Sequence, residues 1–502
     1  MVIFLVYYCA LTFSQNIVYT RIFDTKRSNV PLMIINNHPN YFYLLRYDKK
    51  GHDFDLERRA KQDGKMLAFT PLRLESINAN WFNFENLEYQ LLELNGKIYF
   101  IFEKAENSHH AIYLKTIDTS GTVADFKELA SISRDKTMSD SRFIFSLTAQ
   151  NKLLIIGEQY YNNSTVKKMA LLYDPEKNEN LWIKKLPLEN PYTGYSREFK
   201  CSANNDLFYV LTKSYILSYK RKNVSRVQLS VPVFSYDSLT IVSFLNGEKM
   251  FTKKPLLIKK PFDLKNISLV PFNNSVTAMV HFAKQENPGD DSIFFLIKSF
   301  KSDLSEILFT NCSPLNAAIA KRLTFYDGTD YDGASDKDYT ACEQKSNEDF
   351  IYDLSERKEE SYYKELLLFQ SDLKTGKMIS QQIIPRKIFY FPDRTPFKNI
   401  GLTTQLLRNK NFYCFVLEDN SNVNKTAEDF NFHKFSTKTD LWGGNLISYC
   451  LKENGSLEKK IIYKSNGFDF VPLKYSSNQN DFIFYLNNEK TERFGFLDLK
   501  NF

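Results

Sequence analysis

Near-copies of one hairpin pattern recur along the chain, and this repetition constrains the fold more than any other feature. Residues 445–463 read NLISYCLKENGSLEKKIIY, in which two apolar runs flank the turn sequence ENG. Similar stretches begin at Ala111, Ala170 and Glu365. Two strand-like runs joined by a short polar turn predict a β-hairpin. The chain therefore repeats one β-unit many times.

A second pattern precedes these hairpins and consists of short apolar runs without alternation. A strand that is buried on both faces has this pattern. Copies recur roughly every 55 residues at first and nearer 70 later, and a gap of about 135 residues hides one further unit. The runs lie at 38–47, 95–103, 151–158, 205–212, 274–282, 409–418 and 480–487.

A repeat of this size built from strands alone predicts a radial array of sheets. Each unit covers its apolar faces only by stacking against its neighbours. The 43 Phe and 30 Tyr residues among 502 suit pleated, half-buried surfaces. We predict an all-β fold, a β-propeller of seven or eight four-stranded blades. In each unit we expect a buried strand, a variable loop, an exposed strand, a tight turn and an outer strand.

The two ends of the chain predict how the ring closes. The last unit stops at Phe502 without an outer strand, whereas the strand-like segment 16–23 has no unit of its own. We expect this segment to supply the missing strand. The alternative is two consecutive β-sandwich or smaller propeller domains divided near 255–270, where Pro255 and Pro261 interrupt the pattern.

The N-terminal stretch MVIFLVYYCALTFSQ has the length and apolar character of a signal peptide. We expect residues 1–14 to be removed, which leaves a propeller domain at 15–502 that is secreted, periplasmic or attached to the cell surface. No basic residue precedes the apolar run, so either the true start lies upstream of Met1 or the stretch is an unusual first strand. No later stretch reaches the ~18 apolar residues that a transmembrane helix needs.

Charge and cysteine content exclude several functional classes. The formal charge is +7, but the 66 basic and 59 acidic residues are interspersed, so we expect no nucleic-acid partner. The cysteines after residue 14 are too widely spaced for a zinc site. Cys312 and Cys342 flank the start of an acidic segment, and whether they form a disulfide in an oxidising compartment stays open.

The repeated unit, the export signal and the Lys/Asn/Phe/Tyr-rich composition together resemble exported β-propeller proteins of Bacteroidetes-type bacteria. The resemblance covers most of the chain and rests on pattern. The Trp-Asp dipeptide of WD40 blades, the paired glycines of kelch repeats and the Asp-box of sialidases are absent. It implies a propeller fold and export, and it transfers no functional residue to this sequence.

The segment 324–350 is rich in aspartate and has little apolar periodicity. We interpret it as a solvated acidic insert, with a calcium site as the alternative, because hard cations bind several carboxylate oxygens near a glycine turn. The spacing of an EF-hand is not met, since Gly328 and Tyr339 fall where acidic ligands are required. No other cofactor is indicated. The candidate calcium ligands are Asp327, Asp330, Asp332, Asp336 and Asp338.

The sequence contains no catalytic signature. None of the six histidines lies in an H-E-x-x-H motif, and G-x-S-x-G is absent. The pair His109-His110 is interpreted as part of a surface turn. Trp81 and Trp442 are candidates for stacking on a sugar or on a protein partner, with packing over a blade as the alternative for Trp442.

These observations favour an exported binding or scaffolding module for a protein partner at the cell envelope. The alternative is a carbohydrate-binding protein or carbohydrate-active enzyme whose carboxylates converge at the central channel. An exposed apolar patch would favour the first function, whereas carboxyl groups with raised pKa gathered in an aromatic pocket would favour the second. The ligand, the partner and the oligomeric state are not encoded in any motif.

Overall fold

The computed structural model defines the fold over most of the chain. Side chains are not described throughout every strand, and for β23, β24 and β27 we refer to the backbone alone. The described residues are 17–24, 29–48, 53–73, 89–105, 109–118, 120–133, 140–148, 150–161, 164–186, 194–224, 227–246, 248, 250–256, 258, 262–272, 274–284, 293–316, 330–336, 339–346, 361–372, 375–390, 402–408, 411–418, 420–422, 425, 444–471, 473–477, 480–488 and 490–499.

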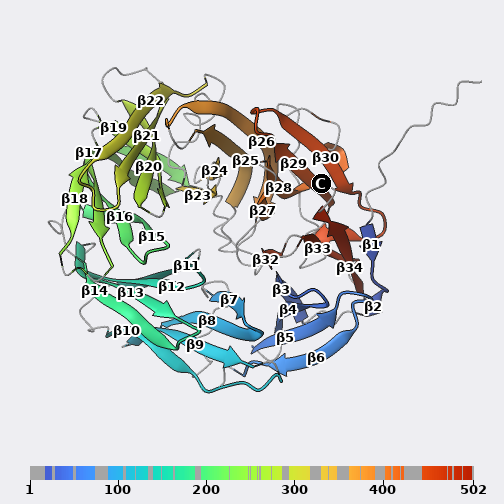
Figure 1. Ribbon diagram of the computed structural model, residues 1–502. Coiled ribbons are helices and arrows are strands. Elements are labelled where there is room, and N and C mark those ends of the chain that lie inside the picture. The colour runs from blue at the N-terminus through green and yellow to red at the C-terminus, as the bar shows by residue number, and fades with distance from the viewer. Residues whose placement is uncertain are drawn as a thin grey trace, which may run out of the picture.

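The described chain is built from β-strands arranged as sheets around a ring, as Figure 1 shows. Each sheet is a blade of about four antiparallel strands. One sheet of eight strands combines two blades, because β17 and β19 are joined only at the pair Tyr236 and Phe262. Dividing it there gives eight blades, in agreement with the predicted β-propeller. The described residues also include a short 3-10 helix, η5 (Asn420–Asn422).

The first four blades follow one another along the sequence. Blade 1 holds β3 (Asn29–Asn36), β4 (Tyr41–Asp48), β5 (Asp53–Ala60) and β6 (Met66–Pro71); blade 2 holds β7 (Tyr89–Leu94), β8 (Lys97–Ala105), β9 (His109–Ile117) and β10 (Lys127–Ser133); blade 3 holds β11 (Asp140–Leu147), β12 (Leu153–Tyr161), β13 (Ser164–Asp174) and β14 (Glu179–Lys185); blade 4 holds β15 (Gly194–Cys201), β16 (Leu207–Val224), β17 (Val227–Phe244) and β18 (Thr252–Pro255).

The other four blades complete the ring and include both ends of the chain. Blade 5 holds β19 (Phe262–Pro271), β20 (Ser275–Lys284), β21 (Ile293–Lys301) and β22 (Ile307–Pro314), and blade 6 holds β23 (Asp330–Asp336), β24 (Tyr339–Ser346), β25 (Ser361–Ser371) and β26 (Met378–Tyr390). Blade 7 holds β27 (Leu402–Arg408), β28 (Asn411–Glu418), β29 (Asn445–Leu451) and β30 (Leu457–Tyr463). Blade 8 holds β31 (Asp469–Val471), β33 (Asp481–Asn487), β34 (Thr491–Asp498), β1 (Ile17–Tyr19) and β2 (Phe23–Asp24), while β32 (Lys474–Ser477) joins blade 1.

The repeated hairpin is the pair of outer strands of a blade, as the sequence predicts. In NLISYCLKENGSLEKKIIY, β29 pairs with β30, and the Gly455 N–H donates to the Lys452 carbonyl at 2.8 Å. Gly455 has a φ of +85°, and the corresponding Gly121 in blade 2 has +88°. A residue with a side chain adopts this conformation only at a cost, which explains why the hairpin turns select Gly or Asn.

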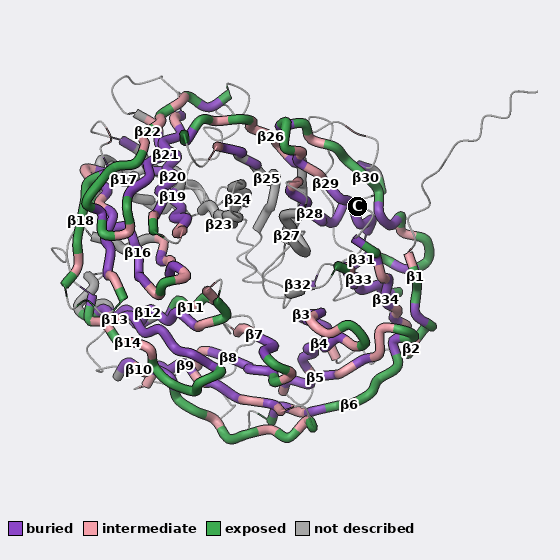
Figure 2. The backbone as a smooth tube through the Cα atoms, viewed as in Figure 1, coloured by how far each residue is buried: buried purple, intermediate pink, exposed green. Residues whose placement is uncertain are grey.

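Burial differs from the prediction in the third strand of each blade. The second strands β4, β28 and β33 are buried over nearly their whole length, as expected from apolar runs without alternation. The third strands β9, β21 and β29 are also mostly buried, although we expected them to be exposed. Only the outer strand is broadly exposed, as the green rim of the ring in Figure 2 shows. A blade inside a ring has neighbours on both faces, so both middle strands lose contact with water.

The sequence predicts that residues 324–350 form an irregular acidic insert, but part of this segment forms β-strands in the structure. Residues 330–336 form β23 and residues 339–346 form β24, and these strands pair with β25 to build blade 6. This blade fills the gap between the apolar runs at 274 and 409. Main-chain hydrogen bonds hold a strand whatever its composition, so an acidic segment without apolar periodicity still enters a sheet.

The hydrophobic core lies between blades rather than at the centre of one layer. Each of the smaller buried clusters joins two neighbouring blades; Ile101 of β8, for example, shares a cluster with Phe143 of β11 and Ile155 of β12. The largest cluster joins blades 7, 8, 1 and 2. The ends of the chain therefore meet where the largest core lies.

Ring closure uses both termini, which confirms the predicted role of segment 16–23. β1 pairs antiparallel with β34 through Ile17 and Leu497, and β2 pairs with the other end of β34 through Phe23 and Glu492. Together β1 and β2 act as the missing outer strand of blade 8. In the opposite direction, the C-terminal β32 pairs in parallel with β3, where Met33 lies opposite Lys474. Figure 1 shows the blue and red ends of the chain side by side.

His281 makes stability depend on pH. This histidine of β20 is buried and stacks on Phe295 at 4.4 Å between ring centroids, and burial lowers its pKa to about 3. An unfolded histidine has a pKa near ~6.5, so the unfolded state binds the extra proton between these values and stability falls as pH decreases below about 6.5. We expect His281 to remove about 2 kcal/mol of unfolding free energy between pH 7 and pH 5.

The measurement is urea unfolding, followed by circular dichroism, of the natural protein and of His281→Leu at both pH values. The substitution is expected to change the absolute stability, so the comparison is between the two pH-dependent differences. We expect the loss on acidification to be smaller by about 2 kcal/mol in the variant. Equal losses in the two proteins would contradict a neutral, buried His281.

Candidate functional site

The residues singled out from the sequence are mostly outside the described part of the chain. Trp81, Trp442, Asp327 and Asp338 fall there. Three candidate calcium ligands, Asp330, Asp332 and Asp336, lie on β23, where the backbone alone is described. Their calcium ligation stays a prediction. Among the described residues, no three His, Cys, Asp or Glu side chains form a group that could hold a metal ion.

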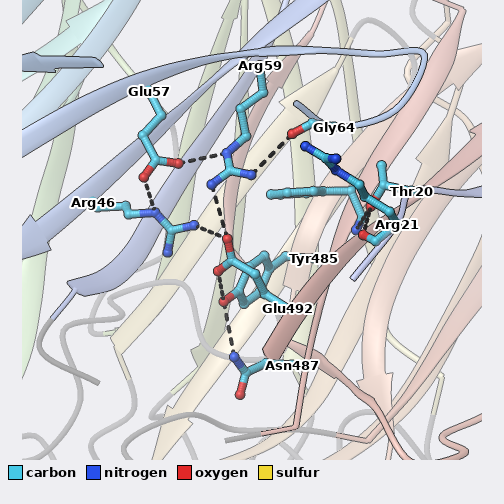
Figure 3. Close-up of polar contacts among 10 residues, drawn as sticks. Thr20, Arg21, Arg46, Glu57, Arg59, Gly64, Tyr485, Asn487 and Glu492 are labelled. Carbon is cyan, nitrogen blue, oxygen red and sulfur yellow. Dashed lines mark hydrogen bonds and ion pairs between the residues drawn. The ribbon is translucent and has the colours of Figure 1, made fainter. Parts of the chain in front are cut away.

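An enclosed ion network lies at the seam between blades 1 and 8, as Figure 3 shows. Arg46 on β4 contacts Glu57 of β5 at 2.9 Å and Glu492 of β34 at 2.6 Å. Arg59 on β5 contacts the same two carboxylates, at 2.7 Å and 3.2 Å. All four side chains are between 2% and 8% exposed. The network is therefore closed to solvent and joins the two ends of the chain.

Neighbouring groups complete this network. Tyr485 donates its hydroxyl hydrogen to Glu492 at 2.8 Å and accepts a hydrogen bond from Asn487 at 3.1 Å. Arg59 donates to the Gly64 carbonyl at 3.2 Å and lies over the Phe23 ring of β2. A β-carbon at Gly64 would lie only 2.7 Å from Thr20. The network thus fixes the β5–β6 turn against the N-terminal strand.

Electrostatics favour the charged forms of Glu57 and Arg46. Burial by itself would raise the pKa of Glu57, but the Arg46 and Arg59 charges outweigh it and lower this pKa below its usual range. The pKa of Arg46 lies well above its ordinary value because the nearby carboxylates of Glu492 and Glu57 outweigh its burial. Two arginines and two glutamates also balance in charge. We assign this cluster to structure and not to ligand binding, since no solvent reaches it.

A second polar cluster lies in the seam between blades 1 and 2. Glu93 of β7 is 9% exposed, and its Oε2 atom accepts no hydrogen bond from the described residues. Burial raises the pKa of Glu93 to about 6, although the Lys61 charge opposes this. The carboxyl acts electrostatically on Tyr43, whose pKa is raised mainly by burial and also by Tyr41 and Glu93. A carboxyl group in such surroundings could exchange a proton near neutral pH.

Asp55 is the other carboxyl group with a pKa raised to about 6, again mainly by burial, with Asp53 as the next cause. Asp55 and Glu93 are not among the charged groups that act on each other. Besides burial, the pKa of Asp55 is affected by the charges of Asp53, Asp48, Glu57 and Arg46. The pKa of Glu93 is affected by the charge of Lys61. The described residues therefore do not bring two raised carboxyl groups together, as the carbohydrate-active alternative would require.

An exposed apolar surface lies on the rim of the ring beside the closure seam. We call it the rim surface and define it as Val18, Ile22, Met66, Leu67 and Phe69, which are between 47% and 59% exposed. These are five of the thirteen large apolar side chains that are exposed in the described residues. The start of β6 and the N-terminal strands lie close together, because a β-carbon added at Gly64, two residues before β6, would lie 2.7 Å from Thr20 and 3.0 Å from Phe23. Figure 2 shows β6 in green along the periphery.

β6 differs from most outer strands in its composition. Its sequence, MLAFTP, carries no charge. The outer strands of blades 2, 3, 4 and 7 each carry lysine, together with glutamate in three of them. Charged side chains on an edge strand discourage pairing with another chain. β22 of blade 5 is comparably uncharged, with Ile307 and Leu308 exposed, and so is the three-residue β1 of blade 8. β6 therefore presents an edge without this protection, next to further apolar side chains.

Comparison with known proteins identifies no family. No family model and no curated protein match the sequence. Among solved structures, dipeptidyl peptidase 4 of Porphyromonas gingivalis is similar with a TM-score of 0.42 and 9% identity, over 92% of this chain and 56% of that chain. A prolyl endopeptidase gives a TM-score of 0.36 and 11% identity, over 92% and 55% of the two chains.

Polysaccharide lyases are also among the similar structures. An ulvan lyase of family PL25 gives a TM-score of 0.37 and 7% identity, over 91% of this chain and 97% of that chain. The chain spans about half the length of the two peptidase chains. At these scores the similarities carry no argument about function, so the proposals below rest on the described residues. In the described part of the chain, no helix has the length and apolar character needed to cross a membrane.

Proposed function

We propose that the protein is a binding module for a protein partner and that an extended strand of the partner pairs with the edge of β6. The observation that carries this proposal is the uncharged, apolar edge of β6 within the rim surface. An added strand would make main-chain hydrogen bonds to β6, while the apolar side chains of the rim surface select the partner's side chains.

The geometry of blade 1 supports this mode of binding. β6 is the last strand of the sheet β32-β3-β4-β5-β6, so one of its edges has no partner strand in the described chain. Phe69 lies opposite Glu57, whose side chain points into the seam with blade 8. Phe69 is therefore on the same face of blade 1 as the N-terminal strands. Arg59 of the ion network donates to the Gly64 carbonyl just before β6 and lies over the Phe23 ring of β2. A surface that is already formed binds without a large ordering cost.

The carbohydrate-active alternative has one supporting observation, the raised pKa of Glu93 beside Tyr43. Glycoside hydrolysis usually needs two carboxyl groups across one pocket. The described residues supply one at this place. We therefore keep the protein partner as the proposal and use polysaccharide binding as a separate outcome of the test.

The test is a quantitative pull-down from cell-envelope extract with residues 15–502, followed by affinity measurement with the protein that is recovered. Phe69→Asp is expected to weaken binding at least tenfold, because a charge would be placed where an apolar side chain is buried in the complex. Leu308→Asp on β22 is the matched control, since it changes an equally exposed side chain on another uncharged outer strand. It is expected to bind normally.

Equal affinity of Phe69→Asp and the natural protein would contradict the proposal, and so would equal losses in Phe69→Asp and Leu308→Asp. Recovery of polysaccharide without a protein partner would favour the carbohydrate alternative. Both variants are at surface positions, so their circular dichroism and thermal unfolding are expected to match those of the natural protein.

A further inference from the structure

A serine, a histidine and a glutamate form one hydrogen-bonded chain in the seam between blades 2 and 3. Ser141 Oγ of β11 lies 2.8 Å from His110 Nδ1 of β9. The other ring nitrogen, Nε2, contacts the Glu103 carboxylate of β8. His110 was interpreted from the sequence as part of a surface turn, but it is the second residue of β9 and is buried. Adjacent His109 instead contacts Glu128 near the surface.

The hydrogen bonds select one tautomer of His110. An ionised carboxylate only accepts hydrogen bonds, so its contact with Nε2 requires the proton on Nε2. Glu103 Oε1 is also 3.4 Å from the Phe143 backbone N–H, which donates toward it. In the neutral ring with its proton on Nε2, Nδ1 is the acceptor and takes the hydrogen of the Ser141 hydroxyl. This is the arrangement in which a histidine can remove a proton from a serine.

Packing holds the three hydrogen-bonded side chains in place. The edge of the His110 ring meets Phe143, with 5.0 Å between centroids and an interplanar angle of 82°. Ser141 is 4% exposed, and the side chains of His110 and Glu103 are 3% and 15% exposed. A nucleophile and its base held by side chains on three strands of two blades are preorganised for one reaction geometry. Because all three side chains are largely buried, we expect only a small acyl group to reach Ser141.

We propose that Ser141 is a nucleophile that His110 activates, and that it accepts a small acyl group from an ester. Ser141 Oγ would add to the carbonyl carbon while its proton moves to His110 Nδ1. The ester C–O bond then breaks, and the same proton goes to the leaving alkoxide. Water, deprotonated by Nδ1, releases the acyl group as a carboxylic acid and restores the hydroxyl. Glu103 is a positioning residue, because it fixes the ring and its tautomer without touching the ester.

The experiment uses a small fluorophosphonate and p-nitrophenyl acetate as probes of the full chain, residues 15–502. We expect one phosphonyl group per molecule, located on Ser141 by peptide mass spectrometry, and a burst of about one equivalent of p-nitrophenol. Ser141→Ala is expected to abolish both. His110→Gln is expected to slow labelling at least 100-fold, the lower range for the loss of a general base.

Glu103→Gln tests whether the three side chains act in catalysis or only hold blades 2 and 3 together. An amide at this position can donate to Nε2 and thereby move the ring proton to Nδ1, which leaves the hydrogen-bonded chain intact with the wrong tautomer. We expect thermal unfolding close to that of the natural protein together with labelling at least tenfold slower. Absence of an adduct on Ser141 in the natural protein would overturn the proposal, as would equal labelling rates in His110→Gln. Neither result depends on binding at the rim surface.

Discussion

Replacing Glu492 with alanine is expected to lower the free energy of unfolding by about 3–5 kcal/mol. Glu492 contacts both Arg46 and Arg59 inside the seam between blades 1 and 8. Without it, two buried guanidinium groups share the single carboxylate of Glu57, and water cannot replace the lost partner. An uncompensated buried charge costs far more than an ion pair in solvent gains.

The measurement is urea unfolding at neutral pH, followed by circular dichroism. Glu306→Ala provides the matched control, because Glu306 pairs with Lys301 at 2.5 Å while both side chains are more than half exposed. A solvent-exposed pair contributes little to stability, so this variant is expected to unfold almost like the natural protein. Similar losses of unfolding free energy in both variants would show that the seam network stabilises the fold no more than an exposed ion pair does.

Removal of residues 15–24 is expected to destabilise the ring by at least a similar amount, on the order of 5 kcal/mol. The deletion takes away the strands that cover the outer edge of β34, together with the side chains of Ile17 and Phe23 that pack on the largest core cluster. It also exposes the main-chain groups of β34, which would then be open to pairing with other chains. Limited proteolysis and the midpoint of urea unfolding measure the loss.

A rearranged chain tests whether the strands or their covalent position matter. A variant that starts at residue 25 and carries residues 15–24 after Phe502, joined by a short flexible linker, would supply β1 as a hairpin partner of β34. We expect it to recover most of the stability that the deletion removes, because β1 already runs antiparallel to β34. A rearranged chain as unstable as the deletion would contradict the assignment of β1 and β2 as the outer strand of blade 8.

The turn and the buried strand were predictable because their causes are local. A left-handed turn selects Gly or Asn at one position, and a strand with apolar residues at every position indicates burial on both faces. Closure by segment 16–23 followed from counting strands at the two ends. The innermost strands, such as β7 and β11, were not recognised, since they mix polar and apolar residues and precede the more conspicuous apolar runs.

The polar clusters were not predicted, although part of their signal is visible in the sequence. Arg46 interrupts the apolar run YFYLLRY, and such a charge inside a buried strand indicates a charged partner. The sequence does not say that the partner is Glu492, 446 residues away. In the same way, Glu103 and His110 are close in sequence, but Ser141 belongs to the next blade. The residues first singled out, Trp81, Trp442 and the aspartates of 324–350, remain predictions.

The sequence by itself determined the all-β class, the repeat, the outer hairpins and the strand that closes the ring. Each depends on periodicity or on turn geometry, which act over a few neighbouring residues. Only the tertiary structure decided that the third strand of each blade is buried as well, that the acidic segment joins a sheet, and which polar groups meet across the seams. Those outcomes depend on contacts between blades, and a seam joins residues whose separation along the chain has no fixed relation to their distance in space.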